Sequence, residues 1–259
     1  PTTEHVYAKP LFIVPPWINK YYILDLNKKK SMVAWLVDQG YTVFILSWIN
    51  PGPAQGAETW ESFMQNTSDA IDVALAETKQ KSLNMVGYCA GGALTATMLC
   101  HMKKKGDKRV DSATLFTAQT EYSNAGELQV FVDEETVKVV DEQMDKGYLP
   151  AHSMANAFNL LRSSDLIWSY VVQNYMLGKE PFPFDLLYWN ADSTSMPAQV
   201  HHFFLEELYN KNSLAKGEMV LFDEKLDLAD ISIPIYHLAP REDHIAPIPS
   251  VYRGAKLME

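Results

Sequence analysis

Short apolar runs alternate with longer segments of helical periodicity along the first half of the chain. The apolar runs cover residues 11–14, 41–47, 82–86 and 113–118. The run at 41–47 (Y-T-V-F-I-L-S) is continuous rather than alternating, which is typical of a strand that is buried on both faces of a parallel sheet.

The segments between these runs predict helices. Apolar side chains recur at helical spacing in residues 59–78, and residues 31–39 begin with Ser31 as a cap and end before Gly40. Residues 93–103 form a third helix-forming run. Strands and helices therefore alternate with short connections, which predicts an α/β fold in which helices cover a parallel sheet.

This alternation stops near residue 120. From there to about residue 230 the chain is helix-rich and aromatic, with helical stretches at 154–161, 166–177 and 199–214 and a Pro-broken segment at 181–184. An apolar run at 231–238 resumes the sheet, and residues 250–259 read as a helix. A helical excursion between two strands is most simply an inserted cap, so we expect a core at 1–120, a mostly helical cap at 121–230 and a second core part at 231–259.

The central motif is the pentad Gly87-Tyr88-Cys89-Ala90-Gly91, which joins a predicted strand to a predicted helix. A strand, a sharp turn and a helix form the nucleophile elbow of α/β-hydrolases, in which the turn lifts the central side chain above the sheet edge. The helix dipole would favour the thiolate of Cys89, and the N–H of Ala90 would point at a developing oxyanion. The alternative is a buried structural cysteine beside a Gly-rich helix start.

Two other segments supply the remaining groups of such a site. The loop after residues 11–14, which includes Ile18, is where α/β-hydrolases keep a second oxyanion-hole amide; its alternative is a Pro-rich turn with aromatic packing. Asp243 follows the run at 231–238, in the position of the triad acid. Its alternative is a solvated loop acid or a helix cap.

The triad histidine should follow one more helix and one more strand, which need about 25 to 30 residues after Asp243. Only 16 residues follow it. We therefore expect a chain that is truncated before the last strand and the triad histidine, and the start at Pro1 rather than Met agrees with a segment of something longer. His244 beside the acid is the alternative base or an assisting residue. We expect packing or surface roles for three cap histidines: His152, His201 and His202.

The composition of the chain argues against several classes of function. The formal net charge of −10 argues against a nucleic-acid partner, because phosphate contacts need clustered Lys and Arg. The two cysteines lie far from any His/Cys cluster, which excludes a zinc site of the usual spacing and a disulfide framework. We expect no metal and no cofactor, and an unpaired reactive thiol fits a reducing cytoplasm. No apolar run reaches the length of a transmembrane helix.

The motifs together resemble the polyhydroxyalkanoate synthases, most closely the class I type, which carries an aromatic residue where this chain has Tyr88. The matching stretches are F-I-V-P-P-W-I-N-K-Y-Y-I-L-D-L at 12–26, T-V-F at 42–44, S-W-I-N-P at 47–51, G-Y-C-A-G-G at 87–92, D-L-L-Y-W-N at 185–190 and R-E-D-H-I at 241–245. They cover nearly the whole chain.

This resemblance implies polymerisation of (R)-3-hydroxyacyl-CoA with release of CoA, so that the CoA thioester is a substrate and no cofactor is required. It implies Cys89 as the acylated nucleophile and Asp243 as the triad acid or the base for the growing chain's hydroxyl. The family's histidine motif, Gly-His-Ile-Ala-Gly, would follow Glu259, and its N-terminal domain would precede Pro1, so we expect this chain alone to be inactive. The resemblance also implies a homodimer and a cytoplasmic location on polyester granules.

Two other functions stay open. One is a cysteine hydrolase or thioesterase of the α/β-hydrolase type, which would release free hydroxyacid. The other is a non-catalytic granule-binding protein on a hydrolase scaffold, although such a scaffold needs neither Cys89 nor Asp243. Monomer chain length, dimer geometry and the open or closed state of the cap are not determined by the sequence.

Overall fold

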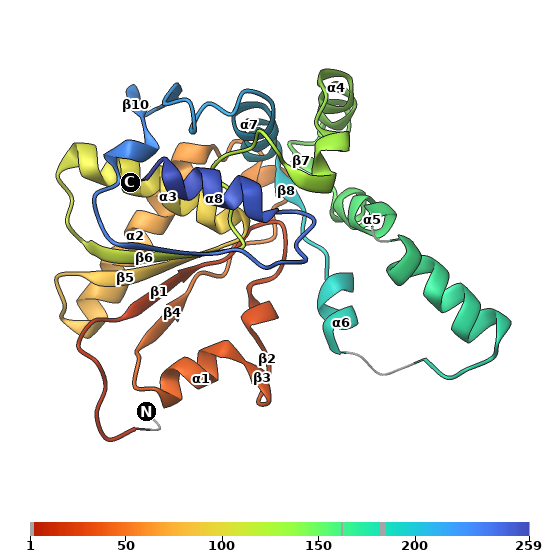
Figure 1. Ribbon diagram of the computed structural model, residues 1–259, viewed down its shortest axis with the longest axis horizontal. Helices are drawn as coiled ribbons and strands as arrows, with labels where there is room; N and C mark the ends of the chain where they lie inside the picture. Colours follow the sequence, from red (N-terminus) through yellow and green to blue (C-terminus); the bar gives the residue numbers. More distant parts are fainter. Residues whose placement is uncertain (1–2, 162, 182–184, 259) are drawn as a thin grey trace.

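A five-stranded, all-parallel sheet forms the centre of the molecule in the computed structural model, which describes residues 3–161, 163–181 and 185–258 (Figure 1). Its spatial order is β11 (Ile235–Leu238), β6 (Val110–Phe116), β5 (Leu83–Tyr88), β1 (Leu11–Val14) and β4 (Val43–Ile45). The chain runs from β1 outward to β4 and then crosses back to β5. This reversal places a topological switch point between β1 and β5, where α/β sheets bind their ligands.

Helices cover both faces of this sheet. They are α1 (Met32–Asp38), α2 (Trp60–Thr78), α3 (Ala90–Lys105) and α8 (Ile248–Lys256). Ile13 of β1 and Val86 of β5 pack with Leu36 of α1 on one face, whereas Phe12 and Met85 point into the larger core under α2 and α3. The two faces alternate along each strand because successive side chains point to opposite sides.

The predicted strands and helices are present, but several differ in their bounds; the run predicted at 231–238, for example, is a strand only over Ile235–Leu238. The helix at 31–39 is capped as expected, because the Ser31 hydroxyl accepts a hydrogen bond from the Ala34 N–H at 2.8 Å. The strand predicted at 41–47 is shorter and only half-buried, because β4 is an edge strand and pairs with only one neighbouring strand. Helix α3 begins directly at Ala90, three residues earlier than predicted.

The region between β6 and β11 is mostly helical. Its elements are η3 (Gly126–Phe131), α4 (Glu134–Glu142), β7 (Tyr148–Leu149), α5 (Ala151–Leu161), the π-helices η4 (Ser164–Trp168) and η5 (Val171–Met176), α6 (Asp185–Ala191), β8 (Met196–Pro197), α7 (Ala198–Phe203), the π-helix η6 (Phe204–Asn210), β9 (Met219–Leu221), β10 (Glu224–Leu226) and η7 (Leu228–Asp230). Of the Pro-broken segment predicted at 181–184, residues 182–184 lie outside the described residues. The division at residues 120 and 230 stays a prediction, because η7 and β10 pack directly on α3 of the core.

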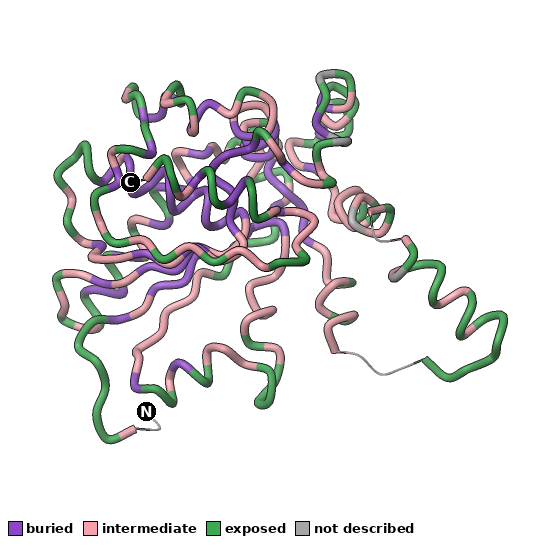
Figure 2. Tube along the Cα trace, viewed as in Figure 1, coloured by how far each residue is buried: buried purple, intermediate pink, exposed green. Residues whose placement is uncertain are grey.

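A helical arm, formed by the described residues between 151 and 191, projects from the body of the molecule (Figure 1). Figure 2 shows it as mostly exposed or half-buried, in contrast to the buried sheet and α3. The C-terminal end of the arm lies against the core. Trp189 Nε1 donates a hydrogen bond to the Lys20 carbonyl at 2.8 Å, and Asp192, directly after α6, accepts one from the Tyr22 hydroxyl at 2.7 Å. No helix within the described ranges combines the length and apolar character that are needed to cross a bilayer.

Candidate active site

Cys89 occupies a strained turn between β5 and α3. Its φ of 53° and ψ of −127° lie outside the regions that non-glycine residues ordinarily adopt. The turn is held by two backbone hydrogen bonds, from the Cys89 N–H to the Phe116 carbonyl at 2.9 Å and from the Gly92 N–H to the Cys89 carbonyl at 2.8 Å. The predicted strand–turn–helix context of the pentad is therefore present.

The glycines around Cys89 are required by close backbone contacts. A Cβ on Gly91 would lie 2.2 Å from the Val14 carbonyl oxygen at the end of β1. A Cβ on Gly87 would lie 2.6 Å from the Cα of Gly92. Both distances are too short for any side chain, so glycine alone allows α3 to start this close to β1 and β5.

The predicted site residues line one cavity of about 590 Å³ at the carboxyl ends of the strands. These residues are Cys89, Ala90, Ile18, Asp243 and His244. They come from the elbow, the loop after β1 and the loop after β11, which are more than 60 residues apart in the sequence. The fold thus brings together all five residues that the sequence singled out.

The electrostatics of the thiol differ from the sequence prediction. The pKa of Cys89 is raised to about 11, chiefly by burial; a hydrogen bond from the Ala90 N–H acts in the opposite direction, and the negative charge of Asp243 adds to the increase. The helix N-terminus was expected to favour the thiolate, but desolvation of the charged form outweighs it. Cys89 is therefore a protonated thiol at neutral pH and needs a base before it can act as a nucleophile.

Asp243 has a structural contact in addition to its place in the cavity. Its Oδ1 accepts hydrogen bonds from the N–H groups of Ile245 and Ala246, at 2.8 and 2.9 Å. The carboxylate therefore organises the loop before α8, and the same residue faces the cavity. It does not cap the helix, which the alternative interpretation expected, because the N-cap of α8 is Pro247 and no side chain bonds to that helix start. The loop is also held by a hydrogen bond from the Glu127 N–H to the His244 carbonyl at 2.9 Å.

The loop after β1 combines both of its sequence interpretations. Trp17 is buried and packs edge-on against Trp60, Phe63 and Phe204, with ring centroids 5.3 to 5.6 Å apart. This is the aromatic packing of the alternative interpretation. The next residue, Ile18, lines the cavity, so the packing of Trp17 positions the backbone that the oxyanion prediction named.

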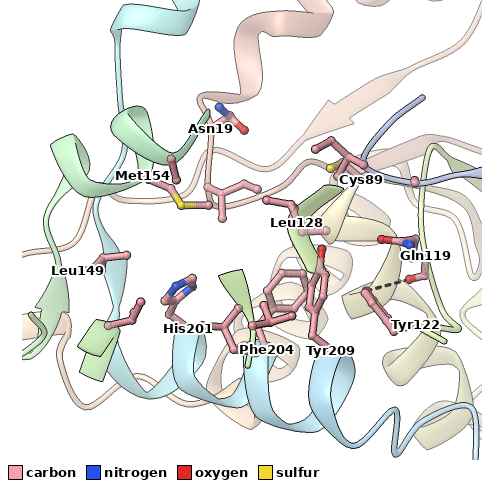
Figure 3. A pocket seen from close by; sticks show the side chains of 18 of the residues that line it. Asn19, Cys89, Gln119, Tyr122, Leu128, Leu149, Met154, His201, Phe204 and Tyr209 are labelled. Carbon is pink, nitrogen blue, oxygen red and sulfur yellow. Dashed lines mark hydrogen bonds between the residues drawn. The ribbon is translucent and has the colours of Figure 1, made fainter. Parts of the chain in front are cut away.

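The sequence analysis missed the residues that line the cavity from α7 and η6. They are His201, Phe204, Leu205 and Tyr209 (Figure 3). Burial raises the pKa of the Tyr209 hydroxyl, and the nearby charge of Cys89 adds to this effect. The spacing of 201, 204, 205 and 208 marks one helical face, which could have placed His201 with the apolar residues. Of the other cap histidines, His202 is exposed and lies 3.0 Å from an oxygen of Asp141.

Polar groups that could hold a metal do not cluster in the site. No group of three or more His, Cys, Asp or Glu side chains with metal-binding geometry occurs among the described residues. Tyr122, deep in the cavity wall, donates its hydroxyl hydrogen to the Gln119 carbonyl at 3.1 Å.

Comparisons with known proteins identify similar families and relatives. Residues 1–36 match a family model described as "Poly-beta-hydroxybutyrate polymerase (PhaC) N-terminus". The chain is 51% identical over 257 residues to the poly(3-hydroxyalkanoate) polymerase of Methylorubrum extorquens, and 49% identical over 256 residues to a poly(3-hydroxyalkanoate) polymerase subunit of Rhizobium meliloti. Each alignment covers 98% of this chain and 42% of the relative. The resemblance found in the motifs is thus confirmed along the chain, which spans less than half the length of these relatives.

Solved structures with low sequence identity share the fold of this chain. The crystal structure of the enol-lactonase from Burkholderia xenovorans superposes with a TM-score of 0.58 at 16% identity, covering 98% of this chain and 81% of the lactonase. At that identity the similarity concerns the fold alone. Residues 21–257 match the family model described as alpha/beta hydrolase fold. The chain therefore belongs to the alpha/beta hydrolase family.

Proposed function

We propose that the protein transfers hydroxyacyl groups from (R)-3-hydroxyacyl-CoA to a growing polyester chain, with Cys89 as the acylated nucleophile. The observation that carries this proposal is a thiol on a strained elbow that shares one cavity with Asp243. The names of the relatives supply the substrate class. A thioester is a suitable donor for a thiol nucleophile, because its leaving group is itself a thiolate.

The first half-reaction loads Cys89. A base removes the thiol proton, and the sulfur attacks the carbonyl carbon of the thioester. The bond to the CoA sulfur then breaks, and the departing thiolate takes up the proton. Because the pKa of Cys89 is raised to about 11, proton removal has to accompany the attack. The N–H groups of Ala90 and Ile18 are the donors for the oxyanion, each worth about 3 kcal/mol.

The second half-reaction extends the polymer. The hydroxyl of a hydroxyacyl unit loses its proton to a base and its oxygen attacks the acyl carbon on Cys89. The carbon–sulfur bond breaks, and the sulfur regains a proton. Asp243 acts here either on the hydroxyl or through a histidine. His244 and His201 are the two histidines among the described residues that line the cavity, and the family resemblance assigns the base to a histidine of another motif.

The walls of the cavity favour polymerisation over hydrolysis. They are mostly apolar side chains, including Leu128, Val132, Leu149, Met154, Phe204 and Leu205. Such walls exclude water, which would otherwise compete with the hydroxyl for the acyl-enzyme. A thioesterase remains the alternative, and it would produce free hydroxyacid instead of polymer.

The test uses the protein expressed from its full coding sequence. Cys89→Ala should reduce CoA release from 3-hydroxybutyryl-CoA by at least about 10³-fold, because no covalent intermediate can form. Cys100→Ala is the matched control, since that thiol is buried in α3 and does not line the cavity. Unchanged CoA release in Cys89→Ala would support the non-catalytic granule-binding function. CoA release without polymer would support the thioesterase.

Association with a second copy or with a polyester granule is the second part of this proposal. The helical arm exposes apolar side chains, among them Trp168, Tyr175, Met176 and Leu177. Exposed apolar groups of this size mark interaction surfaces. We place the protein on cytoplasmic granules as a homodimer, which light scattering and co-sedimentation with polymer particles would test. The inactivity of the 259-residue chain alone stays a prediction.

A further inference from the structure

His201 is a buried histidine in the wall of the cavity. It lies on α7, its side chain is only 4% exposed, and its Nδ1 is buried without a hydrogen-bond partner. The neighbouring His202, in contrast, faces outward and pairs with Asp141. Figure 3 shows the His201 ring pointing into the cavity between Leu149 and Phe204, away from Cys89.

The surroundings of His201 make it a neutral imidazole. Burial lowers its pKa to about 4, and the neighbouring His202 contributes to the same direction. A neutral imidazole offers one N–H donor and one acceptor. A buried polar group that lacks a partner costs about 1 to 3 kcal/mol. Because Nδ1 is itself buried, the ring nitrogen that can donate to a ligand in the cavity is Nε2.

The cavity selects an apolar ligand with carbonyl acceptors. No lysine or arginine among the described residues lines it, so it does not suit the phosphates of CoA. Tyr209 interacts electrostatically with Cys89, and Figure 3 shows Tyr209 on the Cys89 side of this wall and His201 on the other side of Phe204. His201 thus lines the part of the cavity that lies beyond the unit attached to Cys89.

We propose that His201 donates a hydrogen bond to an ester carbonyl of the growing polyester and so holds the chain in the cavity while its thioester end stays at Cys89. This inference depends on the proposed polymerase function. It makes His201 a positioning residue, since it touches neither the thiol nor the acyl carbon that reacts. An amide carbonyl of the pantetheine arm of CoA offers the same chemistry, and the experiment separates the two.

The experiment compares loading with elongation in the protein expressed from its full coding sequence. Butyryl-CoA loads Cys89 but lacks the hydroxyl for elongation, so stoichiometric CoA release from it reports the first step alone. Steady-state CoA release from 3-hydroxybutyryl-CoA and the polymer length report elongation. In His201→Leu we expect loading within twofold of wild type, elongation about tenfold slower and shorter polymer, which corresponds to the loss of one hydrogen bond.

Two variants control for packing. His201→Gln keeps a donor in the same place and should restore elongation to within about threefold of wild type, whereas His202→Leu, which changes the exposed neighbour, should not alter elongation. Equal slowing in the Leu and Gln variants would mean a packing role and would overturn the inference. Equal slowing of loading and elongation would assign the hydrogen bond to pantetheine, and would also overturn it.

The outcomes also separate this inference from the proposed function. Wild-type protein that is never acylated at Cys89 overturns both. Normal loading and normal elongation in His201→Leu overturn only the role of His201.

Discussion

The elbow and the helical arm both contain many apolar residues, but those of the elbow are buried and many of those in the arm are exposed. All of the first eleven residues of α3, which follow Cys89, are buried. In the arm, Trp168 is 60% exposed and Tyr175 is 88% exposed, and none of the described residues of η5 and α6 is buried. Figure 2 shows the same contrast along the trace.

This contrast separates stability from association. Apolar side chains in the elbow region contribute to folding, because they leave water when the sheet and α3 come together. Apolar side chains in the arm stay in water in the single chain and can leave it only against another surface. The elbow therefore belongs to the folding core of this chain, and the arm is the region where we expect a partner to bind.

Two tryptophans test this division with the largest effect. Trp60 is 1% exposed, stacks on Phe203 and donates its Nε1 hydrogen to Thr97 at 3.0 Å. Trp60→Ala should lower the free energy of unfolding by about 3 to 5 kcal/mol, because it leaves a cavity and removes the hydrogen bond that the Thr97 hydroxyl accepts. Trp168→Ala should change it by less than about 0.5 kcal/mol. Chemical denaturation of both variants provides the measurement.

The two tryptophan variants can also be compared in their association with a partner. Trp168→Ala should weaken dimerisation or particle binding, measured by light scattering and co-sedimentation. If Trp168→Ala destabilised the fold as much as Trp60→Ala, the arm would belong to the folding core and the comparison would fail.

The glycines of the elbow give the next largest effect. Gly91→Ala would place a Cβ 2.2 Å from the Val14 carbonyl oxygen, where backbone has to move, and should cost about 2 to 3 kcal/mol and displace Cys89. Gly52→Ala is the matched control, since its Cβ would meet no atom closer than 4.0 Å and its φ of −123° suits alanine. Thermal unfolding and CoA release measure the two consequences, and equal effects of both variants would show that the close contact is unimportant.

The raised pKa of the Cys89 thiol predicts the smallest effect, which is a gradual increase of thiol reactivity with pH. With a pKa raised to about 11, the thiolate fraction of Cys89 should increase tenfold, or by 1.4 kcal/mol, for each pH unit and should still be rising above pH 9. Alkylation by iodoacetamide, followed by mass spectrometry of the Cys89 peptide, measures this slope. Asp243→Asn removes a negative charge and should shift the profile to lower pH. A plateau at or below about pH 8.5 would contradict the raised pKa.

The sequence by itself determined the local features of this protein. The continuous apolar runs placed the strands, Ser31 marked the start of α1, and the glycines around Cys89 marked a turn that only glycine-flanked backbone can make. These features depend on residues that are near each other in the chain, so periodicity and backbone sterics suffice to predict them. The same local motifs supplied the five site residues and the family resemblance.

Only the tertiary structure decided the properties that depend on burial from distant segments. The helix dipole predicted an acidic thiol, but the loops and helices that close over Cys89 remove water and raise its pKa. His201 was expected to be a packing or surface residue, and it lies in the cavity wall because α7 packs against α2, α4 and the short β7–β8 pair. The half-buried state of β4 follows from its place at the edge of the sheet. Desolvation is set by everything that surrounds a group in space, and no stretch of neighbouring residues contains that information.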